Sequence, residues 1–175
     1  MVLLHGFGRS GLSLWQLEHF LKQAGYDVIN VNYPSTILPI DQLVEDYLPR
    51  RLAKRLATGG GRVHFVTHSM GGVLLRGYLQ RHPPVNLGRV VMLAPPNQGS
   101  EAADFWSRSR GLRLFAGPNL ARLGTNPESG PRAFGRVQFD LGVIPAQNLC
   151  RFSRSCCRRN RTMARSRLLP RKFRE

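Results

Sequence analysis

The hexapeptide Thr-His-Ser-Met-Gly-Gly at residues 67–72 constrains the fold of this chain more than any other stretch. It follows the apolar run 63–66 and precedes a helical pattern over residues 73–79. A serine on a sharp turn from strand to helix, with small residues two positions away, is held with its Oγ outside the sheet. The order therefore predicts a nucleophile elbow with Ser69 at its tip. Thr67 replaces the usual first glycine, and an ordinary Ser-Gly turn is the alternative.

A glycine-rich loop follows the first apolar run, residues 2–4. Gly6, Gly8 and Gly11 allow backbone N–H groups to turn toward one point. Their spacing also matches the G-x-G-x-x-G pattern of dinucleotide-binding loops. That pattern needs an acidic residue at the end of the second strand, whereas Asp27 precedes its strand. We therefore expect this loop to face the same site as the elbow and to bind no dinucleotide.

Strands and helices alternate along the first 144 residues, as judged from apolar periodicity. Such alternation is typical of βαβ units and a parallel sheet, whose ligand sites lie at the carboxyl ends of the strands. The glycine-rich loop, the elbow and the loop after the fourth strand all fall at that edge. Strands are expected over residues 2–4, 26–33, 63–66, 89–93 and 138–144, and helices over 14–24, 41–56 with an interruption at Pro49, 70–81, and a short helix or cap within 105–115.

The motifs at these loops carry a family resemblance. With His-Gly-Phe-Gly after the first strand, Thr-His-Ser-Met-Gly-Gly after the third and Pro-Asn-Gln-Gly-Ser after the fourth, residues 1–145 resemble the α/β-hydrolase family, especially its small lipases and esterases. The resemblance implies an α/β fold, a mostly parallel sheet with helices on both faces, here incomplete at its C-terminal end. We assign residues 1–148 to this truncated core and residues 149–175 to an Arg-rich tail that is expected to be disordered.

The resemblance also implies a serine hydrolase mechanism on a small ester or lipid substrate, without metal or cofactor. Ser69 would attack the ester carbonyl, and the backbone N–H groups of Phe7 and Met70 would hold the oxyanion. His68, beside the nucleophile, is expected to be a packing residue. The residues that would shape the oxyanion loop and the elbow are His5, Gly6, Gly8 and Gly71.

The two partners of the nucleophile are missing from the pattern. The family supplies its acid and then its histidine after the serine, yet no histidine follows His82. His82 ends a helix about 18 Å long that leads away from Ser69, and Glu101 is only a fallback for the acid. A serine without a general base is a poor nucleophile. We therefore predict a hydrolase by ancestry with impaired activity, and the compositional break after Asn148 suggests a frameshift that replaced its C-terminal part.

The distribution of positive charge suggests an alternative function. The net charge is +16, and residues 151–175 hold ten Lys or Arg against one acid. Such a tail favours a noncatalytic basic protein that binds nucleic acid or anionic surfaces without sequence specificity. The three cysteines crowd at positions 150, 156 and 157, which is neither a disulfide framework nor a zinc set.

The sequence also allows expectations about the location of the protein and its self-association. No run approaches the length of about 18 apolar residues that spans a membrane, and the start resembles no signal peptide, so we expect a cytoplasmic protein. A sheet that lacks its last strand leaves an unpaired edge, through which copies of the chain could associate.

Overall fold

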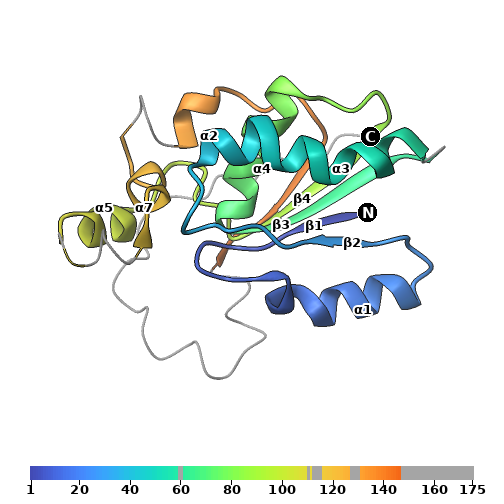
Figure 1. Ribbon diagram of the computed structural model, residues 1–175, viewed down its shortest axis with the longest axis horizontal. Coiled ribbons are helices and arrows are strands. Elements are labelled where there is room, and N and C mark those ends of the chain that lie inside the picture. Colours follow the sequence, from blue (N-terminus) through green and yellow to red (C-terminus); the bar gives the residue numbers. More distant parts are fainter. Residues whose placement is uncertain (59–60, 110, 112–115, 127–130, 147–175) are drawn as a thin grey trace, which may run out of the picture.

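The computed structural model describes residues 1–58, 61–109, 111, 116–126 and 131–146 (Figure 1). Within them a single twisted sheet lies between two layers of helices. Figure 1 shows α1 on one side of the sheet and α2, α3 and α4 on the other. The predicted domain boundary at 148 and the predicted disordered tail lie outside the described residues.

The sheet is parallel throughout, with the strand order β2-β1-β3-β4-β5. This confirms the predicted α/β class with helices on both faces. The second strand is shorter than predicted, because only three of its residues pair with β1, whereas the fourth begins earlier than predicted. The strands are β1 (Val2–Leu4), β2 (Ile29–Val31), β3 (Val63–His68), β4 (Leu87–Leu93) and β5 (Leu141–Ile144).

Helices fill the predicted positions between the strands. The short helix expected within 105–115 is α5, which starts earlier than predicted, and part of that range lies outside the described residues. The helical segments are the 3-10 turn η1 (Gly11–Leu14), α1 (Trp15–Gln23), α2 (Ile40–Gln42), the π-helical η2 (Leu43–Tyr47), α3 (Leu48–Thr58), α4 (Met70–Arg81), α5 (Glu101–Ser107), α7 (Asn119–Arg122) and the 3-10 turn η3 (Pro131–Phe134).

The helical backbone that precedes β3 changes its hydrogen-bond pattern just before Pro49. Its first two segments are α2 and the π-helical η2, and α3 then starts at Leu48 with Pro49 as its second residue. The backbone is continuous, since the Leu48 N–H donates to the Leu43 carbonyl across the π turn, whereas Pro49 has no N–H to donate. The wider π turn is thus where the chain adapts to the proline.

The core has two parts, one on each face of the sheet. Val2 and Leu4 of β1 belong to the larger cluster beneath α2 to α4, while Leu3 between them belongs to a smaller cluster beneath α1. This follows from the alternation of side chains along a strand. Phe20 of α1 is 65% exposed, and the smaller cluster takes Leu14 of η1 and Leu17 and Leu21 of α1 instead.

Candidate active site

Ser69 occupies a strained backbone position between the end of β3 and the start of α4. Its φ is 50° and its ψ is −120°, a conformation that non-glycine residues rarely adopt. Its N–H donates to the carbonyl of Leu93 at 2.8 Å, and its own carbonyl accepts from the Gly72 N–H at 3.0 Å. These bonds anchor the turn to the adjacent strand β4 and to the first turn of α4. The local structure is the sharp strand-to-helix turn that the sequence predicts.

Gly71 lets the first turn of α4 pack directly on the end of β1. A Cβ at this position would lie 2.5 Å from the carbonyl oxygen of Leu4 and 2.7 Å from that of His5. Both obstacles are backbone atoms, so a side chain cannot be accommodated by a change of rotamer. The absence of a side chain at Gly71 is therefore what brings Ser69 up to the loop after β1.

His5 is fully buried and holds that loop through hydrogen bonds. Its Nε2 accepts from the Tyr33 N–H at 3.2 Å, so the proton is on Nδ1, which donates to the Gly6 carbonyl at 2.9 Å. The Tyr33 ring stacks on the imidazole with 4.0 Å between centroids, and its hydroxyl donates to the His5 carbonyl. Burial lowers the pKa of His5 and keeps the ring neutral.

Gly6 and Gly8 shape the part of the loop nearest to Ser69. A Cβ on Gly6 would lie 2.8 Å from Nδ1 of His68 and 3.3 Å from Cβ of Ser69, so the loop backbone is in contact with both. Gly8 has a φ of +62°, and its N–H donates to the Ser35 hydroxyl at 3.0 Å. His68 is half-buried against Gly6, and burial lowers its pKa.

The N–H groups of Phe7 and Met70 are free of protein acceptors within the described part of the chain. Met70 is the first residue of α4, where no intrahelical acceptor exists. Phe7 lies in the loop between Gly6, which contacts Ser69, and Gly8. The arrangement leaves two backbone donors on the two segments that meet at Ser69.

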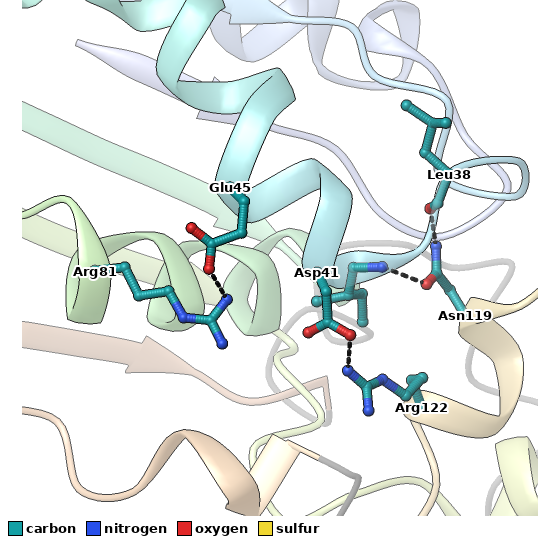
Figure 2. A network of polar contacts seen from close by, with 7 residues as sticks. Leu38, Asp41, Glu45, Arg81, Asn119 and Arg122 are labelled. Carbon is teal, nitrogen blue, oxygen red and sulfur yellow. Dashed lines mark hydrogen bonds and ion pairs between the residues drawn. The ribbon is translucent and has the colours of Figure 1, made fainter.

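The remaining candidates lie elsewhere. His82 is at the far end of α4, 3.4 Å from Glu45, which also pairs with Arg81 (Figure 2). Glu101 is exposed in the first turn of α5. Over the described ranges, no histidine or carboxylate hydrogen-bonds to the Ser69 hydroxyl. The structure therefore brings together His5, Gly6, Gly8, Ser69 and Gly71, and leaves the two fallback partners apart.

Tyr33 belongs to the support of the site, although the sequence did not reveal it. The sequence pattern places it only at the end of the strand expected over residues 26–33. Its hydrogen bonds to His5 span 28 residues, and no local pattern announces such a contact. Burial raises its pKa well above the ordinary value, so the hydroxyl stays a donor.

Beside the loop lies an open cavity of about 510 Å³, lined by Gly8, Arg9, Asn32, Tyr33 and other residues of the loop after β2. It contains no set of metal ligands. Over the described residues, no three His, Cys, Asp or Glu side chains lie close enough together to hold a metal ion. Nor is any helix in that part of the chain long and apolar enough to cross a membrane.

Comparisons with known proteins support the family resemblance. The sequence model of the alpha/beta hydrolase family matches residues 1–170. A search of curated protein sequences gave no significant match.

Two solved structures show the same fold at low sequence identity. The mature lipase BlEst2 from Bacillus licheniformis aligns with a TM-score of 0.61 at 22% identity, over 76% of this chain and 56% of that one. Phospholipase PlaB from Legionella pneumophila, in complex with thio-NAD, aligns with a TM-score of 0.58 at 21% identity, over 82% of this chain and 37% of that one. The chain thus spans about half the length of the lipase and little more than a third of the phospholipase.

Proposed function

This chain belongs to the alpha/beta hydrolase family, and we propose that it derives from a serine hydrolase of carboxylic esters with Ser69 as the nucleophile. The single observation that carries the proposal is the strained backbone of Ser69 on the turn between β3 and α4. A strained backbone of this kind persists only where the surrounding structure enforces it. The turn that causes the strain places the Ser69 hydroxyl at the carboxyl edge of the sheet.

In the proposed reaction the Ser69 Oγ attacks the ester carbonyl carbon. The carbonyl oxygen becomes an oxyanion, which the N–H groups of Phe7 and Met70 would stabilise. Each such donor is worth about 3 kcal/mol in the transition state, because it is already oriented when the charge develops. His5 acts on the reaction only through the loop, by fixing the Gly6 carbonyl and hence the direction of the Phe7 N–H.

The general base is the limiting element of the proposal. No histidine follows His82 in the sequence, and His82 lies at the far end of α4, with its Nε2 3.4 Å from Glu45. An oxyanion hole and substrate binding alone leave an acceleration of about 10³–10⁴ over water. We therefore expect slow turnover by the chain of 175 residues, far below that of a complete triad.

Exposed apolar side chains around the carboxyl ends of the strands favour an apolar ester. They lie on η1 and the start of α1, on the loop after β2 and on α5, where two aromatic rings meet edge to face with 6.3 Å between centroids. Exposed apolar side chains near a ligand-binding edge are available to contact the acyl chain of an ester. The side chains are Leu12, Trp15, Ile37, Phe105 and Trp106.

The test compares wild type with Ser69→Ala on p-nitrophenyl butyrate, together with labelling by a serine-directed fluorophosphonate and mass spectrometry of the peptides. We expect Ser69-dependent turnover and a label on Ser69. Equal turnover by the two proteins with no label on Ser69 would contradict the proposal. Thr67→Ser is the matched control, because it keeps a small hydroxyl residue two positions before Ser69 and should retain the turnover.

Within the described residues β5 is the last strand at its edge of the sheet, which supports a second proposal, self-association of the chain. Val143 and Ile144 are 47% and 40% exposed there, and an uncovered edge strand can pair with another chain. Val143→Lys should lower the apparent mass in sedimentation at high protein concentration. An unchanged oligomer distribution in this variant would argue against pairing through β5.

The basic tail supports an alternative in which the chain binds nucleic acid or anionic surfaces without catalysis. Ten Lys or Arg in residues 151–175 would release counterions on contact with phosphates, so the affinity should fall steeply with salt. Deletion of residues 151–175 should abolish binding to random duplex DNA. Binding that survives the deletion would contradict this alternative.

A further inference from the structure

Helix α4 carries a buried arginine that forms no ion pair with any residue in the described part of the chain. Arg76 is only 7% exposed. Its Nη1 donates to the backbone and side-chain oxygens of Asn97, both at 3.4 Å, and its Nη2 donates to the Gly135 carbonyl at 2.5 Å. The Nε has no partner among the described residues. All the acceptors are neutral, and because a buried charge without a counter-charge is costly, the position favours an anion nearby.

Two further arginines join Arg76 around one cavity of about 550 Å³. Arg132 and Arg136 are exposed at its rim, and the Nε of Arg132 donates to the Gln98 side-chain oxygen at 3.1 Å. Within the described residues the cavity lining contains no carboxylate. Three positive charges therefore converge on a space into which no acidic side chain of the described residues reaches.

A second cavity of about 410 Å³ shares Arg76 and Arg136 with the first and extends along the side of α4. Beyond the shared arginines its lining is mainly apolar, and the Phe134 ring packs closely on α4 at Gly77. The two cavities together form a groove, the arginine groove, that is cationic at one end and apolar at the other. The apolar lining residues are Leu79, Pro83, Leu87, Phe134, Val137 and Phe139.

We propose that the arginine groove binds a single-chain anionic amphiphile, such as a fatty acid, with its head among the three arginines and its chain along the apolar lining. Both volumes lie in the range typical of small-molecule sites. The groove is separate from the elbow, since Arg76 lies seven residues beyond Ser69, about 10 Å along α4. The proposal therefore does not depend on catalysis at Ser69.

Charge also argues against the chain's own tail as the occupant. Residues 151–175 carry ten Lys or Arg and one acid, the same sign as the arginine groove. Like charges at close range repel. An external anion complements the groove, whereas the basic tail does not.

Calorimetric titration of the full chain with dodecanoate, below its micelle-forming concentration, tests the proposal. We expect saturable binding at least tenfold tighter than that of dodecyltrimethylammonium, which has the same chain and the opposite charge. Acetate and inorganic phosphate, which lack a chain, should bind at least tenfold more weakly than dodecanoate. Dodecyl phosphate distinguishes the head group, since tighter binding than dodecanoate would identify a phosphate rather than a carboxylate ligand for the same groove.

Substitutions of lining residues test whether the ligand binds in the arginine groove. The exposed pair Arg132→Gln with Arg136→Gln should weaken dodecanoate binding at least tenfold, and Val137→Trp, which fills the space shared by both cavities, should do the same. Arg89→Gln, at an exposed arginine on β4 outside the groove, is the matched control and should leave the affinity within twofold.

Ser69→Ala separates this site from the proposed active site and should leave dodecanoate binding unchanged. The proposal is overturned if the double arginine variant binds as wild type does, because the ligand is then held elsewhere. It is equally overturned if Ser69→Ala or covalent labelling of Ser69 abolishes binding, because the ligand then occupies the elbow.

Discussion

Two regions of the molecule are built in different ways. The elbow unit, made of β1, β3, α4 and the loop of residues 5–9, is held by direct contact of backbone with backbone, as at Gly71. The cap segment, the described residues between Ala94 and Gly135, contains only short helices, which reach the core through Leu120 and Leu123 and are tied to the loop after β2 by polar side chains. Ser69 is thus held between long elements, whereas the cap segment consists of short elements that depend on a few individual contacts.

Asn119 of α7 makes the clearest of those contacts and is the anchor of the cap segment. It is fully buried, and its side-chain oxygen accepts from the Ile40 N–H at 2.8 Å. Its Nδ2 donates to the Ser35 carbonyl at 2.8 Å and to the Leu38 carbonyl at 2.7 Å, the second of which is drawn in Figure 2. One amide thus satisfies three backbone groups of the loop that leads into α2. Arg122 on the same helix adds an ion pair with Asp41 (Figure 2).

The largest expected effect is in the elbow unit, at Gly71. Gly71→Ala puts a methyl group 2.5 Å from the Leu4 carbonyl oxygen, and we expect a loss of about 4 kcal/mol or more in unfolding free energy. Urea denaturation measures it. Gly8→Ala is the control, because its Cβ meets open space and only the positive φ is unfavourable, at a cost of about 1 kcal/mol. Equal losses in the two variants would contradict the close-packing account.

The cap segment should respond to the loss of its anchor. Asn119→Ala leaves the Ile40 N–H and two carbonyls without their partner, and we expect a loss of about 3 kcal/mol together with faster amide exchange in residues 35–40. Arg122→Ala on the same helix should cost less than about 1 kcal/mol, because its ion pair with Asp41 is partly exposed. If both variants cost the same, the buried amide is not the anchor.

The pH dependence of stability should originate in the elbow unit. Burial lowers the pKa of both His5 and His68 below the ordinary value of 6.5, so the unfolded chain binds protons more readily than the folded one. Their contribution is complete above pH 6.5 and is lost as the pH falls below it. Glu18, whose pKa is lowered by Lys22 and Asn30, affects stability only below its ordinary value of 4.5.

Urea denaturation at pH 7.5, 6.5 and 5.5 measures this dependence. His5→Gln, which removes one titrating group and retains a donor and an acceptor, should show a shallower decline than wild type. A wild-type stability that does not change over this interval would rule out the two histidines as its source.

The smallest effects are expected at Ser69 and Ala94, the non-glycine residues that have a positive φ in the described part of the chain. Ser69 has a φ of 50° and Ala94, at the start of the cap segment, has a φ of 48°. Relief of the strain should make Ser69→Gly more stable than Ser69→Ala by about 1 kcal/mol, and Ala94→Gly should gain a similar amount over wild type. Thermal unfolding of the variants measures both, and a loss at either site would show that its backbone is not strained.

The sequence predicted the sheet and the turn at Ser69 because both depend on short stretches. Apolar runs define strands, and the hexapeptide around Ser69 specifies its own backbone. Tyr33, Arg76 and Asn119 escaped detection, since each acts through partners 21 to 84 residues away. The roles of Phe7 and Met70 as oxyanion donors and of Ser69 as nucleophile stay predictions, for which the activity measurements above are the test.

The strand order has a consequence for how the chain folds as it is synthesised. β1 pairs with β2 on one side and β3 on the other, and β4 and β5 are then added one after another at the same edge. The elbow unit is therefore complete in sequence once Arg81 has left the ribosome, before any of the cap segment exists. Until β4 is made, the Ser69 N–H lacks its acceptor at Leu93, so the strained turn acquires its restraint only in a later step.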